Sequence, residues 1–299
     1  MGIDVPKSAT VESTYKARDV ESAVDIYFYR PTGYQLARLF AALRFTPSMV
    51  SLLGAAIGIT AGHLYYYRDL RLNILGMALH VVTNMLDNAD GQLARLTHRG
   101  SLIGAITDGF ADYLVFLSIY IHLSLRYIVG GGSEAVWLLA LAAALSHAMQ
   151  SMVIDYFRNA YLQFVCGKTS ADANSSETVR AAYEQMSWRE FGKKIGLHSY
   201  WNYARRQEML APMLLRLRVA TARGAPASFR EEYRELCRPL VKFCNALATN
   251  PRMLLLFAVL LLGHPVWYFV LEVTVLNVLL LYVLHRHRAA FRQLVAKLN

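Results

Sequence analysis

DNADGQLAR occupies residues 87–95 of this 299-residue chain, and after eight further residues GAITDGFAD occupies residues 104–112. The two stretches place four aspartates inside sequence that is otherwise apolar enough to span a membrane. An ionised side chain near the middle of a bilayer costs at least about 2.5–3.5 kcal/mol. Four such carboxylates need compensating positive charge, and divalent cations, which prefer oxygen ligands, supply it most simply. We therefore take this region as the candidate active site.

Spacing puts the aspartates on two helical faces. Residues three, four and seven apart share one face of a helix. Asp87 and Asp90 therefore lie on one stripe of a first helix, and Asp108 and Asp112 lie on one stripe of the next. If the short polar turn at residues 98–100 makes these helices antiparallel neighbours, the carboxylates face each other across a gap that two metal ions would fill.

Small residues accompany the acids on the same stripes. Gly91 and Ala94 lie with the first pair of aspartates, and Gly104 lies with the second pair. Without bulky side chains two helices can approach closely, and a ligand can lie against bare backbone. We expect the small residues to serve both purposes.

Composition indicates an all-α, polytopic membrane protein. The chain is 55% hydrophobic and only 17% charged, which is too apolar for a typical soluble domain. A helical span needs about 20 apolar residues. We predict a bundle of six transmembrane helices, at residues 47–67, 72–95, 101–128, 134–160, 248–263 and 265–285. This even number would place both chain ends on the same side of the membrane.

The formal net charge of +10 is distributed unevenly. Lys and Arg crowd residues 168–242 and the tail at 285–288, and Arg95 and Arg99 lie near the turn between the second and third spans. The positive-inside rule makes these regions cytoplasmic, so we expect a protein of the cell inner membrane whose active site and both termini face the cytoplasm. A basic surface beside a membrane normally meets anionic lipid headgroups. Because no nucleic-acid recognition motif accompanies the charge, we expect membrane phospholipids and no nucleic acid as partners.

The sequence divides into four predicted regions. Apolar residues recur at helical spacing from Tyr34 onward, which is typical of a helix lying in the membrane interface. Thr46 and Pro47 are typical of the cap and first turn of a helix and open the first span. The regions are a cytoplasmic arm with the interfacial helix (1–45), spans one to four (46–165), a cytoplasmic insert with helix-like stretches at 200–210 and 230–237 (166–245), and spans five and six with a basic tail (246–299).

Written as D-x2-D-G-x2-A-R-x8-G-x3-D-x3-D, residues 87–112 resemble the signature of the CDP-alcohol phosphotransferases, which are integral-membrane enzymes of phospholipid synthesis. All eight specified positions are filled, and average residue usage makes a chance match on the order of 10^-10 per starting position. The resemblance is sharpest over residues 30–165 and says nothing about the insert.

The resemblance implies an enzyme in which the hydroxyl of an acceptor alcohol displaces CMP from a CDP-alcohol. It implies two divalent ions per site, and the charges of four carboxylates balance those of two dications. Magnesium or manganese is favoured because every proposed ligand is a hard oxygen. The resemblance also implies a homodimer.

Single residues receive roles by the same resemblance, position by position. Asp112 is the implied general base that takes the acceptor's proton, with at most loose metal contact, while Asp108 bridges the two ions. Arg95 would place a permanent cation near phosphate. The implied metal ligands are Asp87, Asp90, Asp108 and Asp112, and the implied CDP-binding residues are Asp87, Gly91, Ala94, Arg95 and Ser101.

Two substrate arrangements stay open. CDP-diacylglycerol can donate a phosphatidyl group to a small polar alcohol, or a soluble CDP-alcohol can donate its headgroup to a lipid hydroxyl. Related enzymes with phosphorylated acceptors tend to carry a Tyr-x-Lys/Arg-x-Arg run, which Tyr156 and Arg158 fit, although Ala160 replaces the second basic residue. Arg158 is therefore the candidate acceptor-binding residue, and with the basic surface it favours the first arrangement.

Two other classes of protein compete with this interpretation. An intramembrane prenyltransferase also uses Asp-rich helices and magnesium, and Asn84, Asp87 and Asp90 partly resemble its first motif. Prenyltransferases have more spans than this chain supplies and do not need glycine, alanine and arginine at these offsets. A cation-coupled transporter would use the carboxylates as an ion path, but transporters usually show a repeated half and none is visible here. Magnesium-dependent release of CMP distinguishes the phosphotransferase from both.

Overall fold

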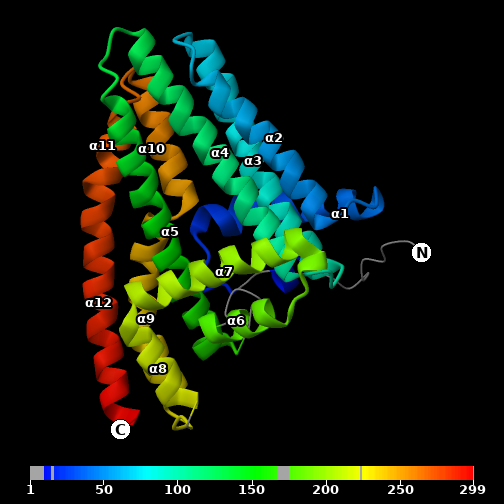
Figure 1. Ribbon diagram of the computed structural model, residues 1–299, viewed down its shortest axis with the longest axis vertical. Coiled ribbons are helices and arrows are strands. Elements are labelled where there is room, and N and C mark those ends of the chain that lie inside the picture. Colours follow the sequence, from blue (N-terminus) through cyan, green and yellow to red (C-terminus); the bar gives the residue numbers. More distant parts are fainter. Residues whose placement is uncertain (1–9, 15–16, 168–174, 223, 299) are drawn as a thin grey trace. The chain divides into compact units, whose positions relative to one another are not determined.

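The computed structural model describes residues 10–14, 17–167, 175–222 and 224–298. Every regular element within these ranges is a helix (Figure 1), which confirms the predicted all-α class. The chain forms two compact units, and the boundary between them falls inside one long helix, at His147.

The first unit contains the candidate site and comprises the described parts of residues 1–147 together with residues 249–274. Two short elements, Glu12–Thr14 and the π-helix Asp25–Tyr29, precede its first long helix. Its α-helices are α1 (Arg30–Ala42), α2 (Pro47–Leu64), α3 (Leu70–Leu96), α4 (Leu102–Val129), the start of α5 (Val136–Cys166), α10 (Thr249–Leu261) and α11 (Trp267–Val273).

Helix α2 is the packing centre of this unit, because it lies against both α3 and α4. The predicted cap is confirmed: the Thr46 side chain accepts a hydrogen bond from the Met49 backbone N–H, and Pro47 is in the first turn. Three glycines four residues apart form the packing face. A Cβ at Gly58 would lie 2.6 Å from a Val115 methyl carbon, and one at Gly62 would lie 2.9 Å from the Ile119 backbone nitrogen. Small residues on α2 therefore set how closely α4 approaches it.

We predict that Gly62→Ala destabilises the protein by about 1–3 kcal/mol, the usual range for overpacking. The added methyl group meets a backbone atom of α4, which cannot rotate away. Thermal unfolding of the purified protein in detergent measures the effect. Gly109→Ala on α4 is the matched control, because nothing described lies within 4 Å of its added Cβ. Equal melting temperatures for the two variants would contradict close α2–α4 packing.

The second unit comprises residues 148–248 and 275–299, apart from the residues not described. Helix α12 packs on α8 and α9, and Phe157 of α5 stacks on His287 with ring centroids 4.0 Å apart. The predicted helix-like stretches 200–210 and 230–237 lie in α7 and α9. The helices of this unit are the end of α5, α6 (Ser176–Gln185), α7 (Phe191–Leu210), α8 (Pro212–Ala222), α9 (Phe229–Ala246) and α12 (Val275–Leu298), with a short helix at Trp188–Glu190.

Among the described residues, five segments are long and apolar enough to cross a membrane, so the polytopic character holds but the predicted count of six is not confirmed. Helix α3 is not among them, because its polar residues, which include Asp87 and Asp90, lower its mean hydropathy. The last predicted span is interrupted at Thr274, which separates α11 from α12 and whose hydroxyl donates to the Val270 carbonyl. The five are Pro47–Leu64, Ile103–Val129, Val136–Cys166, Phe229–Leu261 and Trp267–Leu298.

Candidate active site

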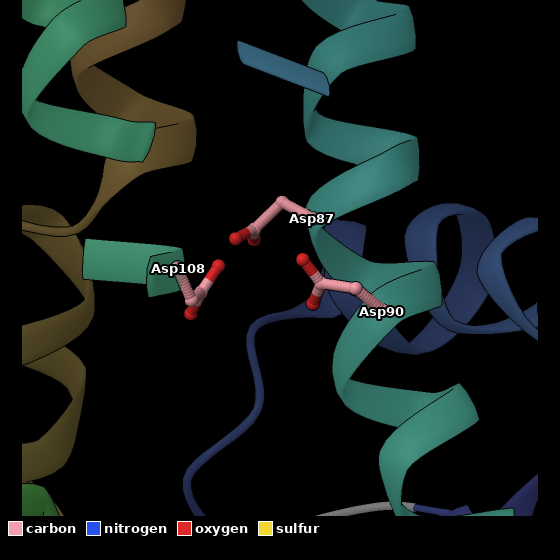
Figure 2. Close-up of side chains that lie close together, drawn as sticks. All are labelled: Asp87, Asp90 and Asp108. Carbon is pink, nitrogen blue, oxygen red and sulfur yellow. The ribbon is translucent and has the colours of Figure 1, made fainter. Parts of the chain in front are cut away.

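Three of the four predicted metal ligands meet in space. Asp87 and Asp90 come from one face of α3, and Asp108 comes from the first half of α4. One carboxylate oxygen of each lies within 4.8 Å of the others, and Figure 2 shows the three side chains turned toward one another. Asp112 lies one turn further along α4, has an exposed side chain and is not one of the three clustered ligands. Its charge still acts on the Asp90 carboxylate.

The three carboxylates differ in their surroundings. Asp90 is buried, with only 4% of its surface exposed, and accepts a hydrogen bond of 2.5 Å from the Ser51 hydroxyl of α2. Asp108 is half-buried, and Asp87 is exposed. Helix α2 thus fixes the innermost acid, while the outer two border open space. Three negative charges this close repel one another, which favours a bound cation between them.

The cluster lies between two helices that scarcely touch. Helix α2 packs along both α3 and α4, whereas α3 and α4 barely approach each other within the described ranges. A Cβ added at Gly91 would meet only the Arg95 guanidinium, at 3.5 Å, and one added at Gly104 would meet only the Ser101 hydroxyl, at 3.2 Å. These two glycines therefore do not mediate helix packing. Their use in leaving backbone accessible to a ligand stays a prediction.

Arg95 lies in the last turn of α3, one turn beyond Gly91. Its Nε and Nη2 atoms are buried and have no hydrogen-bond partner among the described residues. A buried guanidinium donor without a partner costs free energy, and phosphate oxygens satisfy such donors well. Ala94, the preceding residue, is half-buried. This part of the site fits an anionic ligand.

The donor set also fits a divalent cation. All ligand atoms within the cluster are carboxylate oxygens, which magnesium and manganese prefer over nitrogen or sulfur. Asp87, Asp90 and Asp108 would hold the ion, and the Ser51 hydroxyl would orient Asp90. Ser51 was missed at the sequence level. Its only signal is a polar side chain in an apolar helix, which is common in membrane proteins without any such role.

The remaining candidate residues have local structural partners. The Ser101 hydroxyl caps α4 by accepting a hydrogen bond of 3.0 Å from the Gly104 backbone N–H. Arg158 belongs to the second unit, where its Nη2 donates to the Asn245 side-chain oxygen at 2.5 Å. Its Nε is buried without a partner in the described part of the chain. Ala160, which replaces a basic residue, is fully buried.

Comparison with known proteins gives one family. The model of the family described as CDP-alcohol phosphatidyltransferase matches residues 44–171. This range contains α2, α3 and α4 and therefore all three clustered aspartates, together with Asp112 and Arg95. No match was found among curated proteins.

Proposed function

Because the model of the CDP-alcohol phosphatidyltransferase family matches residues 44–171, we propose that the chain is a member of this family and that it transfers a phosphatidyl group from CDP-diacylglycerol to the hydroxyl of a small polar alcohol. The observation that carries the proposal is the group of three aspartates together with the half-buried Arg95, whose Nε and Nη2 are buried and have no partner among the described residues. A diphosphate needs both features, since it carries several negative charges and several acceptor oxygens.

The proposed reaction balances as a displacement at phosphorus. The acceptor hydroxyl oxygen forms a new bond to the phosphorus that carries the diacylglycerol. The bond from that phosphorus to the bridging oxygen breaks, and CMP leaves with this oxygen. The acceptor's proton goes to the Asp112 carboxylate, whose side chain is exposed at the surface of α4. Asp112 is therefore the proposed general base.

Other residues bind and orient the donor in this proposal. Asp87, Asp90 and Asp108 would hold two magnesium or manganese ions, with Asp112 as the fourth and most loosely bound carboxylate. When bound, the ions neutralise the charge of the diphosphate and of the leaving group. Arg95 donates to a phosphate oxygen, and the open backbone at Gly91 lets the nucleotide approach. Asp87, Ala94 and Ser101 complete the proposed CDP-binding set.

Substrate choice and assembly are also part of the proposal. Arg158 is the proposed acceptor-binding residue, supported by its buried and unpartnered Nε. The basic residues of the insert support a cytoplasmic orientation beside anionic lipid. We propose that the active site and both termini face the cytoplasm at the inner membrane, which requires α3 to cross the membrane as a sixth span, and we expect a homodimer.

The test is release of CMP by the purified protein. The protein is incubated with magnesium and either CDP-diacylglycerol or a labelled soluble CDP-alcohol, each with a panel of polar and lipid acceptors. Mass analysis of the lipid product identifies the acceptor. CMP release from CDP-diacylglycerol that disappears with a chelator is expected. Release from a soluble CDP-alcohol alone would reverse the donor assignment, and the absence of release from every donor would contradict the reaction class.

A further inference from the structure

The segment before α1 brings a second buried arginine to the active site. Arg30 is the first residue of α1 and is 8% exposed. Its carbonyl accepts a hydrogen bond of 3.1 Å from the Gln92 side chain, and Gln92 lies on α3 one turn before Arg95 and on the same face. One turn along α1, Gly33 lies against Asn88 of α3, where an added Cβ would be 3.1 Å from the Asn88 Cβ. The start of α1 is thus fixed beside the Asp87–Arg95 stretch.

Arg30 and Arg95 form a cationic pair in this buried position. Their guanidinium groups lie within electrostatic range of each other, and Arg95 also experiences the charges of Asp87 and Asp90. These two carboxylates belong to the proposed metal site, where bound cations would take up their charge. With metal bound, the positive charges of the two arginines would therefore not be fully compensated by these aspartates.

Glu21 compensates part of this positive charge. Arg30 Nη2 donates to both carboxylate oxygens of Glu21, at 2.7 and 3.0 Å, and the Glu21 side chain is only 5% exposed. Only Arg30 hydrogen-bonds to this carboxylate, so Glu21 leaves the buried donors of Arg95 without a partner among the described residues. A carboxylate presents two acceptor oxygens to a guanidinium fork, as a phosphate does.

Three donor atoms of the two arginines make no hydrogen bond within the described structure. Arg30 Nε, Arg95 Nε and Arg95 Nη2 are buried and lack a hydrogen-bond partner among the residues described. Buried polar groups are nearly always paired, and charged donors without acceptors are the most costly. An incoming phosphate offers enough oxygens and charge for both guanidinium groups.

We propose that Arg30 and Arg95 together form a phosphate-binding site, and that Glu21 is an internal competitor that holds Arg30 while no phosphate is bound. The ligand is a phosphate monoester or diester group, and its source is either the CDP donor or a phosphorylated acceptor. The inference deepens the proposed function and rests on it. Binding of phosphate by Arg30 displaces Glu21, so the segment before α1 senses whether the site is filled.

Calorimetric titration of the full-length protein in detergent with magnesium tests the site. The probes are CDP, cytidine and glycerol 3-phosphate, where CDP reports the donor and glycerol 3-phosphate reports a phosphorylated acceptor. Arg30→Gln is expected to weaken binding of one phosphate probe about tenfold or more, because a charge-assisted hydrogen bond is lost. Glu21→Gln is expected to tighten binding of the same probe several-fold, because the competing charge is removed. Cytidine binding is expected to stay unchanged in both variants.

Controls separate the site from general effects. Arg38→Gln removes an exposed cation from the same helix and should leave all three titrations unchanged. Because Glu21 acts through Arg30, the double variant Glu21→Gln/Arg30→Gln should match Arg30→Gln alone. If Arg30→Gln does not fold, Arg30→Lys serves, since it retains the charge without the planar fork and should also weaken binding.

The outcomes distinguish this inference from the proposed function. If the wild type binds CDP and glycerol 3-phosphate but neither the Arg30 nor the Glu21 variants change either affinity, the inference is wrong and the transferase proposal stands. If Glu21→Gln weakens binding, Glu21 supports the site instead of competing, and the proposal is again overturned. If the wild type neither binds CDP nor releases CMP, the proposed function fails, and the glycerol 3-phosphate titrations still test the two arginines.

Discussion

Asp90→Asn is expected to abolish magnesium-dependent binding of CDP. Asp90 is the innermost of the three grouped acids, and it is held by the Ser51 hydroxyl at 2.5 Å. The amide is nearly the same size but carries no charge, so two carboxylates would remain to balance the cations. Loss of a residue that only supports a metal ligand typically costs about 10–100-fold in affinity, and loss of a ligand itself should cost at least about 100-fold.

The measurement is calorimetric titration of CDP with and without magnesium, on wild type and variant. Asp69→Asn is a matched control, because Asp69 is an exposed acid that caps the start of the same helix, and asparagine caps equally well. We expect the control to bind CDP as the wild type does. Unchanged magnesium-dependent binding by Asp90→Asn would remove the cluster from the proposed metal site.

The helices that build the site follow from local sequence. The aspartates recur at helical spacing, and the turn at residues 98–100 is short and polar, so α3 (Leu70–Leu96) and α4 (Leu102–Val129) fall close to their predicted ranges. Thr46 and Pro47 define the start of α2 for the same reason, since a cap depends on only a few neighbouring residues. Elements defined by local pattern are the predictable part of this fold.

Contacts between distant segments could not be predicted in this way. Ser51 and Asp90 are 39 residues apart, and no periodicity relates a serine of α2 to an acid of α3. Glu21 looks like an ordinary charge of the N-terminal arm until the fold buries it against Arg30. The function of a polar residue in such cases depends on which helices become neighbours, and that is decided by packing.

The glycines also show that local sequence does not predict which helices become neighbours. Sequence spacing assigned both close packing and ligand access to Gly91 and Gly104, yet a Cβ added at these positions would meet the nearby Arg95 and Ser101 side chains and no neighbouring helix. Close packing belongs instead to Gly58 and Gly62 of α2, which lie against α4. Because α2 separates α3 from α4, the two acidic helices do not need to touch. The carboxylates of the two helices still meet, with ligand atoms of Asp87, Asp90 and Asp108 within 4.8 Å of one another.

Asp112→Asn is expected to keep CDP binding and lose turnover. Asp112 lies outside the group of three acids, so its amide variant leaves Asp87, Asp90 and Asp108 intact. A general base contributes about 10²–10⁴-fold to rate, and asparagine cannot accept the acceptor's proton. We expect CMP release to fall by that factor, while the affinity for CDP in magnesium changes little.

Parallel measurements on one preparation separate the two roles. CMP release gives turnover, and calorimetric titration of CDP gives binding. Glu134→Gln, which neutralises an exposed acid in the turn between α4 and α5, is the control and should behave as the wild type in both. A variant at Asp112 that loses CDP binding as fully as Asp90→Asn would make Asp112 a fourth metal ligand. A variant that retains full turnover would show that the proton goes elsewhere, because no other step of the proposed displacement requires this carboxylate.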